Sequence, residues 1–207
     1  DGEDDYVDLG SALLSTTDGS QAYTFECWAK TTYSGASTKA IVGQSTSGSH
    51  RFKLVVANGN FVYWKGGSHL ATSSNDFNDD VWHHLAAVKS TSGDVTLYID
   101  GQQEATGTDN NAFENSNTMI GKGHRVFDGK IDEVRIWSDA RTQTEIQANM
   151  NDELTGNEDG LVGYWNFNEG SGTNADDATS NGNDGTINGA TWSTDAPTIT
   201  GSGAIDD

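Results

Sequence analysis

The sequence has little of several residue types, and each shortage excludes a class of protein. Cys27 is the single cysteine among 207 residues, so a disulfide framework, which needs paired cysteines, is excluded. No stretch approaches the roughly 20 apolar residues of a membrane-spanning helix, so we expect no membrane insertion. Lys and Arg number 11 against 31 Asp and Glu, a net charge of -20. A nucleic-acid partner is therefore not expected either, because a basic patch has little to be built from.

What the chain does contain is typical of a folded but very polar domain. Six Trp, six Tyr and seven Phe lie in short apolar runs that look like core, which argues against the disorder that charge alone would allow. Acidity of this kind keeps a protein soluble. It also suits a salty or calcium-rich medium, in which cations screen or bind carboxylates. We expect most acidic side chains to be solvated, and a few in Gly- and Asn-rich loops to be metal ligands.

Short apolar runs with a period of two residues recur along the chain, the pattern of half-buried strands. In Asp94–Asp100, Val95, Leu97 and Ile99 point one way and the residues between them the other, and a tight Asp-Gly turn follows. Similar runs are Tyr6–Leu9, Tyr23–Lys30, Lys39–Gly43, Arg51–Ala57, Phe61–Lys65, Val81–Lys89, Asn117–Gly121, Gly129–Trp137, Leu161–Phe167 and Thr186–Trp192. About a dozen strands separated by turn residues predict an all-β, two-sheet antiparallel sandwich.

One segment departs from this pattern. Thr142 and Glu145 form a capping box, which predicts a short helix through about Asn149 with Ile146 and Met150 on one face. We expect this helix to pack against an open end of the sandwich.

The sequence predicts one domain over residues 1–194. The last residues, 195–207, contain the single proline and are predicted to be a linker or the start of a next module. The chain opens on Asp-Gly-Glu-Asp-Asp rather than on a basic and then apolar stretch, so we expect a fragment of a longer protein without a signal peptide.

Seven motifs, taken together and in this order, carry a family resemblance. They are Asp4–Gly10 (DDYVDLG), Tyr23–Lys30 (YTFECWAK), Val81–Val88 (VWHHLAAV), Leu97–Gly101 (LYIDG), Phe127–Trp137 (FDGKIDEVRIW), Gly160–Phe167 (GLVGYWNF) and Asn181–Gly185 (NGNDG). On these motifs the chain resembles the laminin-G-like, concanavalin A-like lectin/glucanase modules of bacterial surface or secreted proteins. The last two motifs precede the first in many relatives, so the chain resembles the circularly permuted form. The resemblance implies a jelly roll of two curved sheets, often with a structural calcium.

The resemblance and the residues together suggest where calcium would bind. Hard cations prefer carboxylates and carbonyls from flexible loops, and residues 176–185 offer both. In the resembled modules, the Asp of the Ile-Asp-Glu-Val-Arg strand and the Asp that opens this loop are associated with Ca²⁺, and these positions match Asp132 and Asp177. Asn183 and Asp184 are weaker members of the same predicted site. The alternative is a solvated turn, with Asp132 hydrogen-bonded to loop amides.

Nothing in the sequence predicts catalysis. Glucanases on this fold use carboxylates spaced Glu-x-Asp-x-x-Glu on one strand, where alternation points them into one cleft. The nearest candidates, Asp132 and Glu133, are adjacent, so we expect them on opposite faces of the sheet and unable to act on one bond. Gly-x-Ser-x-Gly, His-Glu-x-x-His and Walker patterns are absent from the sequence. The protein is predicted not to be an enzyme.

Sugar sites combine aromatic rings with a few polar groups, and two loops are candidates for such a site. Tyr63, Trp64 and His69 flank one Gly-rich turn, and His124 and Arg125 occupy another, where they suit an anionic sugar or a carboxylate. The alternative for both loops is an ordinary hairpin tip. The resemblance places four tryptophans at core positions, and a core position is also expected for His84 and for the cysteine. These tryptophans are Trp28, Trp82, Trp137 and Trp165.

The leading prediction is a non-catalytic, calcium-containing extracellular module for adhesion or carbohydrate binding within a larger bacterial surface or secreted protein. Its partners would be a carbohydrate or cell-surface glycan and neighbouring domains of the same chain, and the isolated domain is expected to be monomeric. Two alternatives stay open: a structural spacer of an adhesin stalk, or an ancillary carbohydrate-binding module of a polysaccharide-degrading enzyme. The fold alone does not separate these functions.

Overall fold

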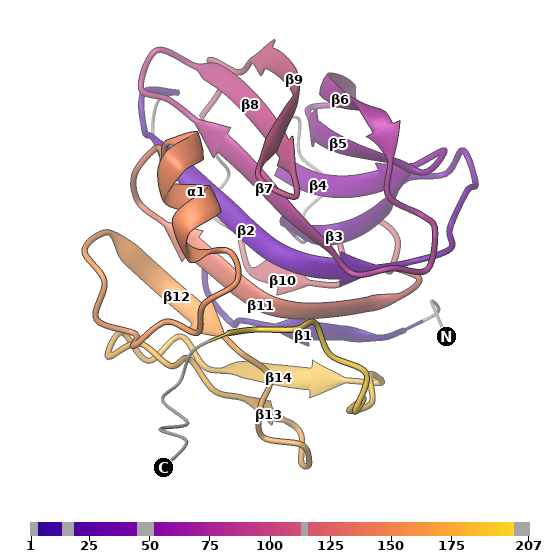
Figure 1. The fold of residues 1–207 in the computed structure, drawn as a ribbon, viewed down its shortest axis with the longest axis vertical. Coiled ribbons are helices and arrows are strands. Elements are labelled where there is room, and N and C mark those ends of the chain that lie inside the picture. Colours follow the sequence, from indigo (N-terminus) through magenta and orange to yellow (C-terminus); the bar gives the residue numbers. More distant parts are fainter. Residues whose placement is uncertain (1–3, 14–18, 45–51, 113–115, 201–207) are drawn as a thin grey trace.

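The computed structural model describes residues 4–13, 19–44, 52–112 and 116–200. Within them the chain forms two antiparallel sheets and one short helix, the jelly-roll sandwich that the sequence predicts (Figure 1). The eight-stranded sheet has the order β13 (Asn174–Ala175), β14 (Gly185–Asn188), β1 (Tyr6–Asp8), β10 (Thr118–Ile120), β3 (Lys39–Gln44), β4 (Phe52–Ala57), β5 (Asn60–Lys65), β6 (Ser68–Asp76). The six-stranded sheet has the order β12 (Leu161–Trp165), β11 (Lys130–Trp137), β2 (Tyr23–Lys30), β7 (His83–Lys89), β8 (Asp94–Ile99), β9 (Gln102–Thr108).

The core lies between the sheets and follows from strand alternation. Phe25 and Cys27 of β2 face inward together with Leu54 and Val56 of β4, because residues two apart on a strand share a face. Cys27 is buried and free, as predicted. Burial of such apolar surface is the main stabilising contribution to a sandwich of this kind.

The C-terminal strand, β14, lies beside the first strand in the eight-stranded sheet. β14 pairs with β1 in register Tyr6–Asn188 and Asp8–Thr186, which is the arrangement expected of the circularly permuted form. The sequence pattern does not predict three of the strands: β6 and β9 are edge strands, and β13 has only two residues. Edge strands bury little of their surface, so a polar sequence without clear alternation forms them.

The predicted helix is present, but its predicted location is wrong. α1 (Gln143–Asn149) begins with the capping box between Thr142 and Glu145. It does not close an end of the sandwich. It lies on the outer face of the six-stranded sheet (Figure 1), where Ile146 packs on Ala86, Val88 and Tyr98. That face carries apolar side chains that would otherwise be exposed to water.

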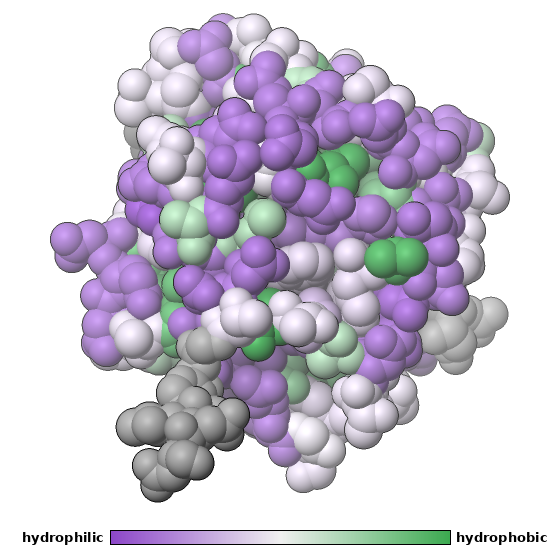
Figure 2. Space-filling model, viewed as in Figure 1, coloured by the Kyte–Doolittle hydropathy of each residue, from purple (hydrophilic) through white to green (hydrophobic). Residues whose placement is uncertain are grey.

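The surface on the α1 side is mostly hydrophilic, with small and separate hydrophobic patches (Figure 2). This agrees with the expectation that most of the acidic side chains are solvated. No helix in the described ranges is long and apolar enough to cross a membrane.

After β14, residues 189–200 form a C-terminal segment that crosses the molecule without regular structure (Figure 1). Its Asp195 accepts hydrogen bonds from Trp82 and Lys30, at 3.0 and 3.1 Å. Farther along, the Thr200 amide donates to the Asn151 carbonyl at 2.5 Å. The predicted domain boundary at residue 194 stays a prediction, but residues on both sides of it contact the sandwich.

Candidate functional site

A cavity of about 170 Å³ lies where the edge of β11 is not covered by β12. β1 and β14 contribute one wall, the start of β11 contributes another, and the C-terminal segment passes across it. We call this cavity the notch. Its polar and aromatic lining includes Tyr6, Trp82, Asp132, Phe167, Trp192 and Asp195.

The notch is rich in aromatic rings that are only half buried. Trp82 donates its indole N–H to Asp195 at 3.0 Å, and Trp192 donates to the Gly172 carbonyl at 3.0 Å. Phe167 packs edge-on against Trp192 with ring centroids 6.4 Å apart. The indoles are therefore held in place while part of each ring stays accessible.

The expectation of a core position is wrong for Trp82 and also for Trp28, because both are only half buried. Trp82 comes one residue before β7 begins, so the opposite sheet does not cover its ring. Trp192 follows β14 in the C-terminal segment, and only the crossing of that segment brings it to the notch. Trp82 stands one residue before a strand, whereas Trp192 comes four residues after one, so no common sequence signal marks both.

Asp195 fastens the C-terminal segment over the notch. Besides Trp82, it contacts Lys30 at 3.1 Å and Lys130 at 2.5 Å. Hydrogen bonds from Lys130, Trp82 and Lys30 hold the pKa of this carboxyl well below its usual range. Lys130 is thereby neutralised, so the second notch carboxylate, Asp132, has no cationic partner among the described residues.

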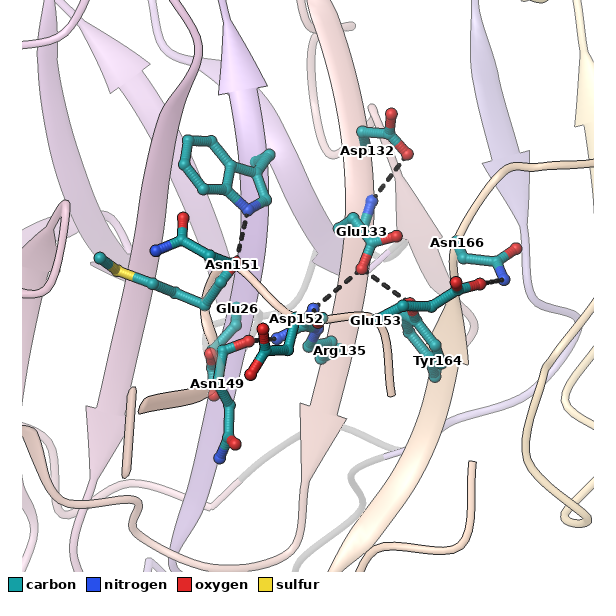
Figure 3. Close-up of polar contacts among 12 residues, drawn as sticks. Glu26, Asp132, Glu133, Arg135, Asn149, Asn151, Asp152, Glu153, Tyr164 and Asn166 are labelled. Carbon is teal, nitrogen blue, oxygen red and sulfur yellow. Dashed lines mark hydrogen bonds and ion pairs between the residues drawn. The ribbon is translucent and has the colours of Figure 1, made fainter. Parts of the chain in front are cut away.

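A bulge in β11 overturns the expectation that Asp132 and Glu133 lie on opposite faces. The register of β11 with β2 shifts between Asp132 and Arg135, and Glu133 has a positive φ of 52°. An extra residue in one strand interrupts the side-chain alternation. Asp132 is paired with Trp28 and Arg135 with Glu26 on the outer face, and Glu133 reaches Arg135 on that same face (Figure 3).

Sharing a face does not turn the two carboxylates into a catalytic pair. Glu133 is 4% exposed and accepts hydrogen bonds from Arg135 at 2.9 Å and from Tyr164 at 2.7 Å. Asp132 lines the notch and Glu133 does not. The Asp132 carboxylate thus faces a cavity, while the Glu133 carboxylate stabilises the fold through Arg135 and Tyr164.

The buried network around Glu133 connects the sheet to the chain that follows α1 (Figure 3). Arg135, fully buried, donates to the carbonyls of Asn149 and Asp152 at 2.8 and 2.6 Å. Trp28 donates to the Met150 carbonyl at 2.9 Å. These bonds satisfy carbonyls at the helix C-terminus, which have no partner within the helix.

Asp132 has the environment of a carboxylate that lacks a cation. Burial raises its pKa to about 7, and repulsion from Glu133 and Glu169 adds to the effect. The amide of Glu133 is its hydrogen-bond donor. Oε2 of Glu169 is also buried and accepts no hydrogen bond. These oxygens suit a hard cation such as Ca²⁺, so the Asp132 side of the predicted metal site fits.

The loop side of the predicted metal site is already occupied by hydrogen bonds. Asp177 accepts four, from the amides of Tyr164, Thr179 and Asn183 and from the Thr179 hydroxyl. Asp184 accepts from the Asp177 amide at 2.9 Å. Hydrogen bonds therefore hold Asp177, Asn183 and Asp184 together within one loop, while Asp132 lies on β11. In the described ranges, no group of three or more His, Cys, Asp or Glu side chains is arranged to hold a metal ion.

The predicted ligand-binding residues divide between two places. Tyr63 is fully buried in the core, where its hydroxyl donates to Asp109 at 2.6 Å, so its ring is not presented to a ligand. Trp64 and His69 are paired neighbours on the outer face of the eight-stranded sheet. His124 and Arg125 are exposed on a loop that lies against that same face.

Comparison of the chain with known protein families and solved structures agrees with this architecture. Residues 1–147 match a laminin G family model of the concanavalin A-like lectin/glucanases superfamily. A candidate carbohydrate-binding protein from Bacteroides ovatus is similar in structure with a TM-score of 0.74 at 23% identity, over 96% of this chain and 62% of that one. The chain thus spans less than two thirds of that protein.

Two more distant structures share part of the fold. Domain 4 of AbnA, an extracellular arabinanase from Geobacillus stearothermophilus solved with arabinotriose, has a TM-score of 0.53 at 26% identity, over 65% of this chain and 70% of that one. A heptameric pentraxin from Limulus polyphemus has a TM-score of 0.53 at 15% identity, over 70% and 75%. No curated protein matches the sequence. Since the family model covers well over half of the chain, this protein belongs to the concanavalin A-like lectin/glucanases superfamily.

Proposed function

We propose that this protein is a non-catalytic carbohydrate-binding module and that the notch is its sugar site. The observation that carries the proposal is the pair of half-buried indoles, Trp82 and Trp192, beside the carboxylates Asp132 and Asp195 in one cavity. Aromatic rings stack on the apolar faces of sugars, and carboxylates accept hydrogen bonds from hydroxyls. With only Lys130 as a cation, and that neutralised by Asp195, the notch suits a neutral sugar.

A binding role is favoured over catalysis by the state of the acidic residues. Glu133 is locked to Arg135 and Tyr164, and Asp195, another carboxylate of the notch, is held by Trp82, Lys30 and Lys130. A glycosidase needs two carboxyl groups on either side of one bond. The module would instead bind sugar by stacking and hydrogen bonding.

We further propose that the module works outside the cell, within a larger bacterial surface or secreted protein. The Bacteroides ovatus protein is longer than this chain, and the arabinanase domain belongs to an extracellular enzyme. The latter favours the role of an ancillary binding module in a polysaccharide-degrading enzyme over adhesion. A spacer without a ligand is the outcome if no sugar binds.

Removing one notch indole is expected to weaken sugar binding. The probe is arabinotriose, with xylo- and cello-oligosaccharides alongside, followed by calorimetry. Trp192→Ala should raise Kd about tenfold, because one stacking ring is lost. Trp28→Phe is the matched control, since Trp28 lies beneath the chain after α1, outside the notch. Equal losses in both variants, or no binding to any neutral oligosaccharide on a broad glycan array, would exclude the notch as a sugar site.

Calcium remains part of the proposal, with Asp132 as the central ligand. A cation that binds only the folded state stabilises it by about 2.7 kcal/mol at 100 times Kd. For a chain of this length that raises the melting temperature by roughly 5–10 °C. We expect EDTA to abolish this gain, and Asp132→Asn to make the protein insensitive to EDTA. Asp177→Asn should lower the melting temperature equally with and without calcium, because the four hydrogen bonds that Asp177 accepts hold the loop in place. A melting curve that EDTA leaves unchanged contradicts the calcium proposal.

A further inference from the structure

The basic side chains of this acidic protein differ in whether they contact oxygens of the protein itself. Six of them contact oxygens of the protein itself: Lys65, Arg135 and Arg141 contact carboxylates on nearby strands and loops, Lys30 and Lys130 contact Asp195, and Lys89 contacts main-chain carbonyls. These six stabilise the fold and leave no charge for a ligand. The cations on the outer face of the eight-stranded sheet are arranged differently.

That outer face carries a row of residues in direct register. Gly43 of β3 is paired with Lys53 of β4, Lys53 with Trp64 of β5, and Trp64 with His69 of β6. Directly paired residues of neighbouring strands point to the same side of a sheet. The Lys53 ammonium lies 4.4 Å from the centre of the Trp64 ring. Both residues are buried, at 3% and 8% exposure, so this pair lies beneath the exposed groups of the face.

The loop of residues 121–126 lies across the same row. The Arg125 carbonyl accepts a hydrogen bond from the Ala40 amide at 3.2 Å, and a Cβ added to Gly123 would lie 2.8 Å from Cδ of Lys53 and 3.0 Å from Cβ of Ala40. The glycine therefore permits the close approach of the loop. His124 and Arg125 remain exposed above the sheet.

Lys122 adds a further charge to this face. Its ammonium lies 3.5 Å from the centre of the Tyr6 ring, a distance typical of a cation–π contact. Within the part of the chain that the structure describes, no carboxylate lies within ion-pair distance of Lys122, His124 or Arg125. In a chain with net charge -20, the three unpaired basic groups are neighbours on one loop.

We propose that this surface, the basic face formed by His69, Lys122, His124 and Arg125 above the buried Lys53 and Trp64, binds the carboxylate or sulfate of an acidic saccharide. Arg125 supplies the planar fork of donors that matches such oxyanions. Lys122 adds a second positive charge and His124 a ring nitrogen beside it, and the buried contact of Lys53 with Trp64 lies beneath this loop. The basic face adjoins the notch, since Lys122 lies over the ring of Tyr6, a residue of the notch lining. Its ligand is nevertheless of opposite character, because the notch is lined by carboxylates. The net charge of the whole protein repels long polyanions, so the ligand is a short acidic oligosaccharide or one acidic sugar of a chain.

The test compares trigalacturonate with the uncharged galactotriose by calorimetry at physiological salt. Trigalacturonate should bind and galactotriose should bind at least tenfold more weakly. Arg125→Glu should weaken the binding of trigalacturonate at least about tenfold, since it removes charge-assisted hydrogen bonds. Lys39→Glu changes the net charge by the same amount and is the matched control, because Lys39 is paired with the core residue Val56 and lies over the Tyr33 ring.

Two outcomes would overturn the proposal. One is equal affinity for the acidic and the neutral trisaccharide. The other is an equal effect of Arg125→Glu and Lys39→Glu, which would show a response to net charge alone. Arg125 is exposed on a loop, so its replacement should leave the melting temperature unchanged, and a second variant, Lys122→Gln, gives an independent reading if it does not. Trp192→Ala should leave trigalacturonate binding intact, which separates failure here from failure of the notch.

Discussion

Replacing Arg135 with methionine is expected to lower the free energy of unfolding by about 3–5 kcal/mol, the typical effect of breaking a buried ion pair. Arg135 is fully buried and is the ionic partner of Glu133 at 2.9 Å. The variant would leave the Glu133 carboxylate in the interior with the Tyr164 hydroxyl as its remaining hydrogen-bond donor. It would also free the carbonyls of Asn149 and Asp152. Denaturation by urea measures the change.

A double variant separates the buried charge from the lost packing. Glu133→Gln combined with Arg135→Met removes both charges, so it should recover part of the stability lost in the single variant, as a double-mutant cycle reports. Arg141→Met is the control with exposed carboxylate partners: Asp139 and Glu145 are 49% and 43% exposed. Its guanidinium also lies 4.2 Å from the centre of the Trp137 ring, so the variant should cost about 1–2 kcal/mol. A loss in Arg135→Met no greater than that of this control would contradict a structural role for the buried pair.

The second large effect is expected at the other end of the sandwich. Asp109 and Lys65 form a buried ion pair at 2.9 Å with side chains that are 0% and 1% exposed. Tyr63 donates to the same carboxylate oxygen at 2.6 Å, and two nitrogens of Asn111 donate to the other at 3.0 Å. Asp109→Asn would leave the Lys65 ammonium in the interior without its carboxylate partner, while the Asn111 carbonyl still accepts from it at 2.8 Å. We expect a loss of about 3–5 kcal/mol at pH 7.

The loss of stability in Asp109→Asn should depend on pH in a way that identifies its ionic origin. Burial alone would raise the pKa of Asp109, but hydrogen bonds from Tyr63 and Lys65 outweigh it and hold the pKa below its usual value. A carboxyl with a lowered folded-state pKa stabilises the protein above its unfolded pKa, and this contribution disappears as the pH falls through the folded pKa. The difference between wild type and Asp109→Asn should therefore shrink below about pH 4. A difference that is constant from pH 7 to pH 2.5 would contradict the ionic origin.

Much of the fold was accessible from the sequence because local rules and tertiary packing agree there. The alternation of Val95, Leu97 and Ile99 predicts β8, and all three are buried. The capping box predicts α1 because its hydrogen bonds close within four residues and need nothing from the rest of the chain. The edge strands β6 and β9 were missed, since they bury too little surface to show a period of two.

The candidate sites were less accessible, for a different reason. The motif around Asp132 pointed to the correct strand, but alternation failed at the bulge, which places Glu133 on the side of Arg135. Tyr63 and Trp64 looked equivalent at one turn, yet one faces the core and the other the outer surface. A single-residue shift in register reverses every such assignment.

The sequence by itself determined that this protein is an acidic all-β domain with a capped helix and the motifs of a known superfamily. Periodicity, turn residues and charge are local or additive properties, so they can be recognised without knowing which segments meet. The tertiary structure decided the rest: the notch exists because residues 189–200 cross the open edge of β11, and the basic face exists because residues 121–126 lie on β3 and β4. Both sites join segments far apart in the chain, and only the packing of two twisted sheets places them side by side.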